Sequence, residues 1–326
     1  MKMRASLISL AVAIVALVLV ARQLDWRGVA EAWSHMLWPW LVVAALVNVT
    51  NTWIEGLRWR TILDASEIKV SPTLAFASML IGTVGNVFLP LKLGEAARGW
   101  ALSRLTGSSV TTVLSTVVLD RVVDGVAVVP LLIAVAVIGS PGLKLPGLRA
   151  ITIGMAVAAV VIGVGVLAWN QLRRRHSTAS GSRLAPHLEA FGQGLRTLRQ
   201  HHDLAKALTF GVLSWCTRVA VVWCMFPAFR LAWSPVRAAV TLIGLNLSII
   251  AVATPGNVGT FELAGSGLVH YFGAPPEIAV SYAVALHIAE VVPTVLLGAF
   301  AIWRLGLRFD RQDIAEIGTK RESNQC

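Results

Sequence analysis

The sequence predicts an all-α polytopic membrane protein with about six full transmembrane helices and two re-entrant or broken helical hairpins. Of its 326 residues, 56% are hydrophobic and only 14% are charged, whereas soluble proteins carry roughly 25% charged residues. The mean hydropathy is +0.71, and apolar stretches recur along most of the chain. These observations exclude a soluble globular domain, a disordered chain, a fibrous repeat and a disulfide-stapled secreted module.

Six apolar stretches predict full crossings, because a helix needs about 20 residues to span the hydrocarbon core. They lie at about 1–21, 37–54, 110–138, 148–169, 204–229 and 278–303. The first stretch follows Lys2 and Arg4 and reads as a membrane helix, with a signal peptide as the alternative. Trp33, Trp38 and Trp40 flank the start of the second and suit an interfacial aromatic belt.

Three shorter apolar stretches, at about 72–89, 236–253 and 258–272, abut Pro/Gly breakers. We expect them to form two broken elements, at about 72–104 and 236–272. Non-helical backbone is tolerated at membrane depth where it lines a cavity. Two complete crossings in place of each hairpin would preserve the same topology.

The net charge of +11 would suggest nucleic acid as a partner of a soluble chain. In a membrane chain, such an excess reports cytoplasmic loops. The segment 170–206 and the tail 305–326 carry much of it and should be cytoplasmic, whereas the loops 139–147 and 230–237 fit the outer face. We therefore expect one transmembrane domain over 1–304 in a bacterial inner membrane, with both termini cytoplasmic and no nucleic-acid partner.

The two broken elements share a Gly four residues after a Pro, and a Glu shortly after that Gly. The residues are Pro90, Gly94 and Glu95 in the first element, and Pro255, Gly256, Asn257, Gly259 and Glu262 in the second. The preceding apolar arms each hold an asparagine, Asn86 and Asn246. An inverted pair of interrupted helices points to a transporter site, whose half-helix ends attract anions such as phosphate. The alternative is that the Pro-Gly pairs merely end helices at loops.

Asp120, Arg121 and Asp124 lie within an apolar stretch, where a charge costs about 3 kcal/mol. The two aspartates share a helical face, and Arg121 can pair with Asp124. The cluster is either functional or a self-compensated structural set. Similarly, Glu95 and Arg98, with Lys92 before them, suit the binding of a phosphate diester.

Two further ionisable pairs are ambiguous. Arg58, which follows Glu55, is a candidate ligand, but an interfacial Trp/Arg anchor at the inner end of the second span is favoured there. Glu262 has Arg218 as a candidate partner. His287 and Glu290 are spaced i,i+3 and could shuttle protons, or the histidine could be a packed core residue.

Enzymatic signals are weak. There is no nucleotide-binding phosphate loop, zinc-protease motif or serine nucleophile elbow. Cys216, Cys224 and Cys326 lack metal-ligand spacing. We expect no cofactor, no metal and no catalytic residue. Asp25 and Glu31 are the only outer-face carboxylates for a lipid-linked transferase.

Three motifs in order carry a resemblance: Leu89-Pro90-x-x-x-Gly94-Glu95-x-x-Arg98, Asp120-Arg121-x-x-Asp124 and Thr254-Pro255-Gly256-x-x-Gly259-x-x-Glu262. Together they resemble the transmembrane domain of lysylphosphatidylglycerol synthase, which also occurs as stand-alone membrane proteins. Two positions depart from the family pattern: Asp120, where Glu is commoner, and Asn257, where a second Gly is frequent. The resemblance implies a phospholipid flippase, and no lipid aminoacylation is expected, because no synthase domain follows the last span.

The expected function is therefore transport of an anionic phospholipid or a polyprenyl-linked lipid. The expected headgroup ligands are Lys92, Arg98 and Arg121, with Glu95, Asp120, Asp124 and Glu262 balancing charge or coupling protons, and Asn86, Asn257 and Arg58 completing the site. One alternative is an accessory or scaffold protein of a lipid or glycan pathway. The other is a lipid-linked glycosyl- or acyltransferase. A lipid-modifying or glycosyltransferase partner and a homo-oligomer are both compatible with the sequence.

Overall fold

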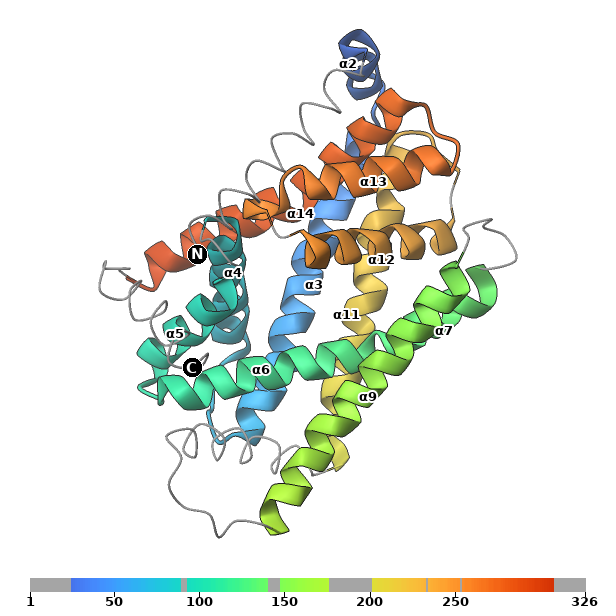
Figure 1. Ribbon diagram of the computed structural model, residues 1–326. Helices are drawn as coiled ribbons and strands as arrows, with labels where there is room; N and C mark the ends of the chain where they lie inside the picture. The colour runs from blue at the N-terminus through green and yellow to red at the C-terminus, as the bar shows by residue number, and fades with distance from the viewer. Residues whose placement is uncertain are drawn as a thin grey trace, which may run out of the picture. The chain divides into compact units, whose positions relative to one another are not determined.

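The computed structural model describes residues 25–88, 93–139, 147–175, 201–232, 234–252 and 254–307. Within these ranges all regular structure is helical (Figure 1). The elements are α2 (Trp26–Ser34), α3 (Trp38–Ala65), α4 (Pro72–Phe88), α5 (Gly94–Thr106), α6 (Val110–Ala127), α7 (Val129–Ala134), the π-turn η2 (Val135–Gly139), α9 (Leu148–Arg175), α11 (His201–Ala228), α12 (Pro235–Ala251), the 3-10 turn η3 (Pro255–Asn257), α13 (Thr260–Tyr271) and α14 (Pro276–Arg304).

Five helical stretches are long and apolar enough to cross a membrane. They are Trp38–Ala65, Val110–Ile138, Leu148–Gly165, His202–Ala228 and Pro276–Arg304. These match five of the six predicted crossings, and the sixth, at 1–21, lies outside the described residues. The protein is thus a multi-pass membrane protein with an all-helical fold.

The boundaries of two predicted segments differ from those in the structure. The second crossing was expected to end near Ile54, but α3 continues to Ala65 and carries Arg58 within the helix. The basic loop expected at 170–206 is shortened at both ends, because α9 continues through Arg175 and α11 begins at His201. Residues 176–200 lie outside the described ranges.

The chain divides into two compact units, each assembled from three separate segments. Unit 1 comprises Met1–Asn51, Thr83–Gly94 and Cys216–Gly298; unit 2 comprises Thr52–Gly82, Glu95–Trp215 and Ala299–Cys326. No single cut in the sequence separates the units. The single transmembrane domain expected over 1–304 stays a prediction.

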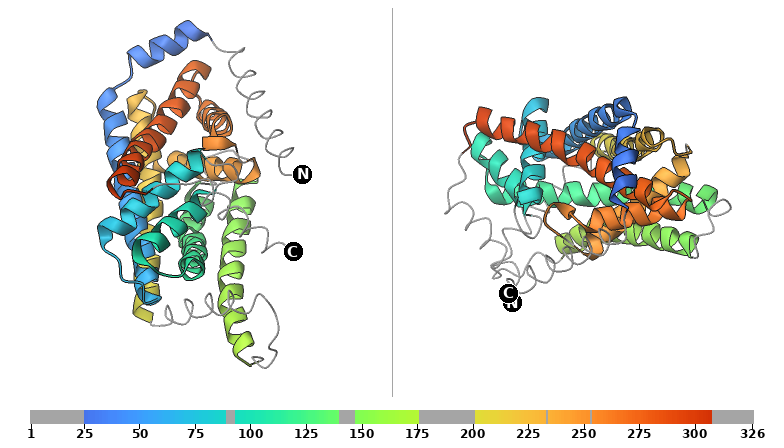
Figure 2. Two further views of the ribbon diagram at one scale, coloured as in Figure 1. Left: turned by 90° about the vertical axis from the view of Figure 1, so that its left-hand side faces the viewer. Right: turned by 90° about the horizontal axis from the view of Figure 1, so that it is seen from above.

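Helices α3 and α11 run antiparallel, side by side, in all the views of Figures 1 and 2. In unit 1, the amide of Leu37 donates to the carbonyl of Ala228 at 2.9 Å. In unit 2, the hydroxyl of Ser214 donates to the carboxylate of Glu55 at 3.3 Å. The start of α3 therefore lies beside the end of α11.

Both predicted broken elements consist of a helix, a break and a second helix. The first is α4 followed by α5, and the second is α12 followed by η3 and α13. In unit 1, α12 and α13 pack against each other (Figure 1). A Cβ added at Gly265 of α13 would lie 3.4 Å from the side chain of Leu245 in α12. The two short apolar stretches of the second element are thus paired helical arms.

In unit 2, a close backbone approach joins α3 to α4. A Cβ added at Gly56 would lie 3.1 Å from both the backbone nitrogen and the Cα of Phe76. The ring of Phe76 also contacts Trp53 edge to face, with centroids 5.1 Å apart. A side chain at position 56 would therefore meet backbone, which cannot rotate away.

We predict that Gly56→Val lowers the unfolding free energy by about 1–3 kcal/mol, because overpacking forces the two helices apart. Thermal unfolding of the purified full-length protein in detergent measures the effect. Gly154→Val in α9 is the matched control, since a Cβ there meets nothing within 4 Å. Equal melting temperatures for the two variants would contradict the close approach.

Candidate functional site

Unit 2 contains a network of ionisable side chains on three helices, which we call the charge network. Its members are Arg58 of α3, Glu95 and Arg98 of α5, and Asp120, Arg121 and Asp124 of α6. Three arginines face three carboxylates, so the formal charges cancel. Charges are tolerated inside a membrane protein when they are paired in this way.

The buried end of the charge network is centred on Asp120. Arg58 donates from Nε to Oδ1 of Asp120 at 2.8 Å and from Nη1 to Asp124. Arg98 donates from Nη2 to Oδ2 of Asp120 at 3.0 Å. The side chains of Arg58 and Asp120 have no exposed surface, and that of Arg98 has 1%. One aspartate therefore ties α3 and α5 to α6.

An aromatic wall supports this buried end. The guanidinium of Arg98 lies 4.7 Å from the ring centroid of Trp59, and the indole of Trp59 donates to Thr116 at 3.0 Å. Sequence reasoning did not assign Trp59 to the site. Its position next to Arg58 was visible, but its orientation toward Arg98 depends on helix packing.

The other end of the charge network reaches the surface of unit 2. Arg121 is 41% exposed and Glu95 is 35% exposed. Oε2 of Glu95 lies 2.7 Å from Nη2 of Arg98 and 3.5 Å from Nε of Arg121. The expected pairing of Arg121 with Asp124 is present at 3.7 Å. A partly exposed side chain thus places a buried carboxylate oxygen, Oε2 of Glu95, between two guanidinium groups.

The interfacial-anchor interpretation of Arg58 is wrong. An anchor must reach the headgroups, whereas Arg58 is fully buried among carboxylates. Its neighbour Trp59 has no exposed surface either. The Glu55/Arg58 charges suggested the end of a crossing, but they lie well inside α3 because partners from α6 compensate Arg58.

In unit 1, the second breaker lies next to the end of α4. A Cβ added at Gly256 would lie 3.8 Å from Cγ1 of Val87, near the end of α4. The carbonyl oxygen of the Asn86 side chain accepts from the amide of Gly94 at 3.1 Å, which caps the start of α5. The matched Asn246 instead donates to Leu242 within α12. The two asparagines therefore differ in role.

The second breaker has left-handed backbone at successive residues, since Gly256 and Asn257 both have φ of 59°. Glycine adopts this region freely, and asparagine tolerates it better than most residues. The departure from the family pattern at Asn257 is therefore compatible with the same turn. The carbonyl of Asn257 also accepts from the hydroxyl of Thr260 at 3.1 Å.

Glu262 and His287 clamp this breaker from both sides. The carboxylate of Glu262 accepts from the amide of Gly259 at 2.6 Å, capping the start of α13. Nδ1 of His287 lies 2.5 Å from Oε1 of Glu262, and Nε2 lies 3.0 Å from the carbonyl oxygen of Gly256. The imidazole stacks on Phe261, with centroids 4.4 Å apart. We call Glu262 and His287 the breaker clamp.

Hydrogen bonds at both ring nitrogens of His287 require one proton more than a neutral imidazole and a carboxylate carry together. A carbonyl oxygen only accepts, so Nε2 of His287 must carry the proton that it donates to Gly256. The contact between Nδ1 and Glu262 then needs a second proton. Loss of that proton would leave two acceptors facing each other.

Glu262 has a closer partner than the sequence suggested. It pairs with His287 on α14, while the charge of Arg218 acts on Glu290. His287 hydrogen-bonds to Glu262 on α13 and also interacts electrostatically with Glu290, three residues later on α14, so the proton relay between His287 and Glu290 stays a prediction. Helix spacing allowed the intrahelical pair, but a side chain from another helix lies closer to the imidazole nitrogen.

Some predicted residues cannot be placed. Pro90 and Lys92 lie outside the described residues, and only the backbone of Pro255 is described. Asp25, one of the two outer-face carboxylates considered for a transferase, accepts from the amide of Arg27 as the cap of α2.

Comparison with known proteins adds to this geometry. Residues 6–298 match the family model described as the lysylphosphatidylglycerol synthase TM region. The chain belongs to this family. One relative is a UPF0104 membrane protein of Methanothermobacter thermautotrophicus, which is 24% identical over 285 residues, covering 80% of this chain and 82% of the relative. The expected resemblance is confirmed.

We predict that Asp120→Ala lowers the unfolding free energy by about 3–5 kcal/mol, because it removes a partner from two buried arginines. Arg121→Gln is the matched control on the next residue. Its exposed contacts should contribute about 1 kcal/mol or less. Thermal unfolding in detergent measures both variants, and a loss of similar size in each would contradict the central role of Asp120.

We predict that His287→Leu releases the second breaker. A hydrogen bond to a charged group contributes about 1.5–3 kcal/mol, and about 1.4 kcal/mol corresponds to a tenfold change. Amide exchange of the peptide 254–262 should therefore be roughly tenfold faster. Hydrogen–deuterium exchange with mass spectrometry measures it, with the exposed His202→Leu as control. Unchanged exchange in His287→Leu would refute the clamp.

Proposed function

We propose that this protein is an integral membrane lipid transporter, a flippase that moves an anionic phospholipid or polyprenyl-linked lipid between leaflets of the bacterial inner membrane. The family supports a lipid substrate, because its description names a synthase of a phospholipid, lysylphosphatidylglycerol. Family membership alone does not specify transport; the charge network supplies the more specific support. Both termini would be cytoplasmic, and the protein would act as a carrier and not as an enzyme.

The observation that carries the proposal is the accessible end of the charge network. Glu95 places a carboxylate between the guanidinium groups of Arg98 and Arg121. A phosphate group presents the same kind of anionic oxygen to arginine, often in bidentate geometry. A lipid headgroup phosphate would therefore replace Glu95 between the two arginines. Lys92, close by in the sequence, would add a third cation.

A conformational change at the first breaker could move Glu95 and let a headgroup phosphate take its place. Glu95 lies in the first turn of α5, directly after the break that Asn86 caps through Gly94. A change of backbone conformation at the break would move Glu95 relative to Asp120 and Arg121 on α6. Such a discontinuous helix can alternate between two arrangements around a polar site.

The breaker clamp is the candidate for proton coupling. Its shared proton joins Glu262 to His287, while Glu290 and the cation Arg218 act on the same region of unit 1. Loss of the proton would set the imidazole against the carboxylate and weaken the hold on Gly256 and Gly259. Proton release would then favour a different conformation of the second breaker.

The test is transport of fluorescent phosphatidylglycerol in liposomes containing the purified full-length protein. We expect Arg121→Gln to slow transport by about tenfold, because a hydrogen bond between a charged donor and the headgroup phosphate contributes about 1.5 kcal/mol or more, and about 1.4 kcal/mol corresponds to a tenfold change. Glu95→Gln should bind the lipid more tightly, because it leaves the arginines without their internal anion. Arg104→Gln, an exposed charge loss on α5, should transport at the wild-type rate.

Two outcomes would contradict the proposal. Wild-type transport by a folded Arg121→Gln would mean that the charge network is structural, which favours the accessory or scaffold alternative. If the breaker clamp couples protons, a pH gradient should accelerate transport by the wild type. The same acceleration in His287→Leu would contradict a role of the breaker clamp in proton coupling, while leaving the proposed lipid site intact.

A further inference from the structure

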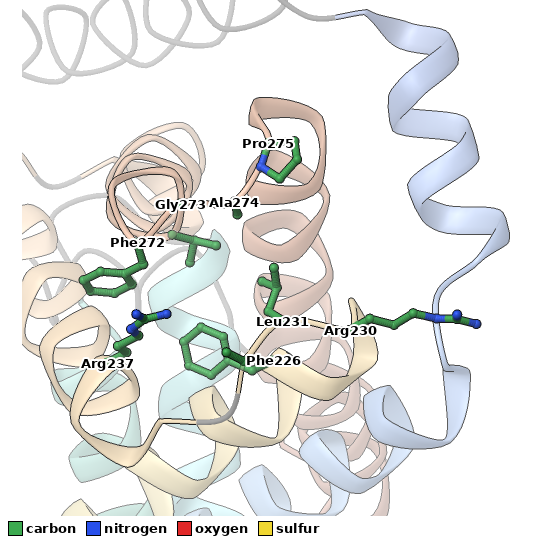
Figure 3. A pocket seen from close by; sticks show the side chains of 10 residues that line it. Phe226, Arg230, Leu231, Arg237, Phe272, Gly273, Ala274 and Pro275 are labelled. Atoms are coloured by element: carbon green, nitrogen blue, oxygen red, sulfur yellow. The ribbon is translucent and has the colours of Figure 1, made fainter.

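A second polar site lies at one end of unit 1, where four helix ends meet. A partly open cavity of about 220 Å³ is lined by the end of α11, the start of α12, the end of α13 and the residues that lead into α14 (Figure 3). Its lining includes the apolar side chains of Phe226, Leu231, Val269 and Phe272. We call this cavity the surface pocket.

The surface pocket has two arginines and no acidic residue among the residues that line it. Neither Arg230 nor Arg237 forms an ion pair in the part of the chain that the structure describes. In the charge network, by contrast, every arginine contacts at least one carboxylate. The surface pocket therefore has uncompensated positive charge.

Arg237 lies against an aromatic ring of the surface pocket. Its guanidinium lies 5.6 Å from the ring centroid of Phe272, and Figure 3 shows the two side chains facing each other. A guanidinium resting on a ring keeps its N–H edge available for phosphate oxygens. The Ser234 hydroxyl accepts from the backbone amide of Arg237 and fixes this turn of α12.

Arg230 lies at the rim and extends away from Arg237 (Figure 3). It lies two residues after the end of α11 in a left-handed conformation, with φ of 57°, while the amide of Leu231 donates to the carbonyl of Phe226. Glycine is the usual residue at this position of a helix end. On the opposite wall, the equivalent position after α13 is Gly273, with φ of 99°. Arg230 therefore adds a positive charge to the rim at a position where glycine would avoid the steric strain of a positive φ.

The surface pocket lies beside ends of membrane-spanning helices. It adjoins the end of α11 and the start of α14, both long and apolar enough to cross a membrane. The carbonyl of Ala228, at the end of α11, accepts from Leu37, and the next residue, Trp38, is 51% exposed. Exposed tryptophans favour the membrane–water interface. The cavity is also smaller than the roughly 300 Å³ at which sites for drug-sized ligands begin, which suits a headgroup and not a whole lipid.

We propose that the surface pocket binds the phosphate of an anionic phospholipid, with Arg237 as the direct ligand, Arg230 at the entrance and the acyl chains left in the bilayer. The apolar walls would contact the glycerol carbons. This site differs in its residues from the charge network and does not depend on transport.

The test is thermal unfolding of the full-length protein in detergent, titrated with phosphatidylglycerol, phosphatidylcholine or inorganic phosphate. We expect phosphatidylglycerol to stabilise the wild type most, and Arg237→Gln to need about tenfold more lipid for the same shift. Arg149→Gln, an exposed arginine in the first turn of α9, is the matched control and should behave as wild type.

Three outcomes would overturn the proposal. Inorganic phosphate could stabilise as well as the lipid, which would indicate a free-anion site. Phosphatidylcholine could match phosphatidylglycerol, or Arg149→Gln could lose as much response as Arg237→Gln. If Arg237→Gln does not fold, a phosphatidylglycerol with a photoreactive headgroup is cross-linked to the wild type. Cross-links within 226–237 or 269–275 support the site, and their absence from both peptides refutes it.

Discussion

The ion pairs that Asp120 forms with Arg58 and Arg98 determine how three helices of unit 2 meet. An unpaired charge at this depth costs several kcal/mol, so each arginine must lie where a carboxylate oxygen is available. Asp120 provides one oxygen to each guanidinium. The requirement fixes the rotation of α3 and α5 about their axes relative to α6, and it brings Trp59 onto the face of Arg98.

In unit 1, backbone amides and carbonyls at the helix breaks need hydrogen-bond partners, just as the buried charges of unit 2 need ion-pair partners. A break in a membrane helix frees amides and carbonyls that need partners. Asn86 satisfies an amide at the first break, and Glu262 and His287 satisfy an amide and a carbonyl at the second. The two glutamates that match in sequence therefore have different chemistry. Glu95 faces guanidinium groups, whereas Glu262 faces an imidazole and a backbone amide.

Together these features fit a protein in which compensated charge is structural and uncompensated charge is available to lipid. Arg58 and Arg98 belong to the first kind. Arg121 is intermediate, because its carboxylate partners can exchange with a headgroup. Arg237 is of the second kind, with a ring beneath it and no carboxylate beside it in the described chain. Arginines paired with carboxylates are thus expected to stabilise the fold, whereas arginines without a carboxylate partner in the described chain are expected to bind lipid.

The sequence by itself determined that this is a polytopic membrane protein, and it determined all five described crossings and the interruption of both broken elements. Apolar length, scarcity of charge and Pro/Gly breakers are local properties, readable along one dimension. It also identified the ionisable residues inside the apolar segments. It did not determine their partners: Arg58 meets Asp120 across 62 residues and His287 meets Glu262 across 25. Those pairings depend on the rotation and packing of separate helices, which no local spacing encodes, so only the tertiary structure decided them.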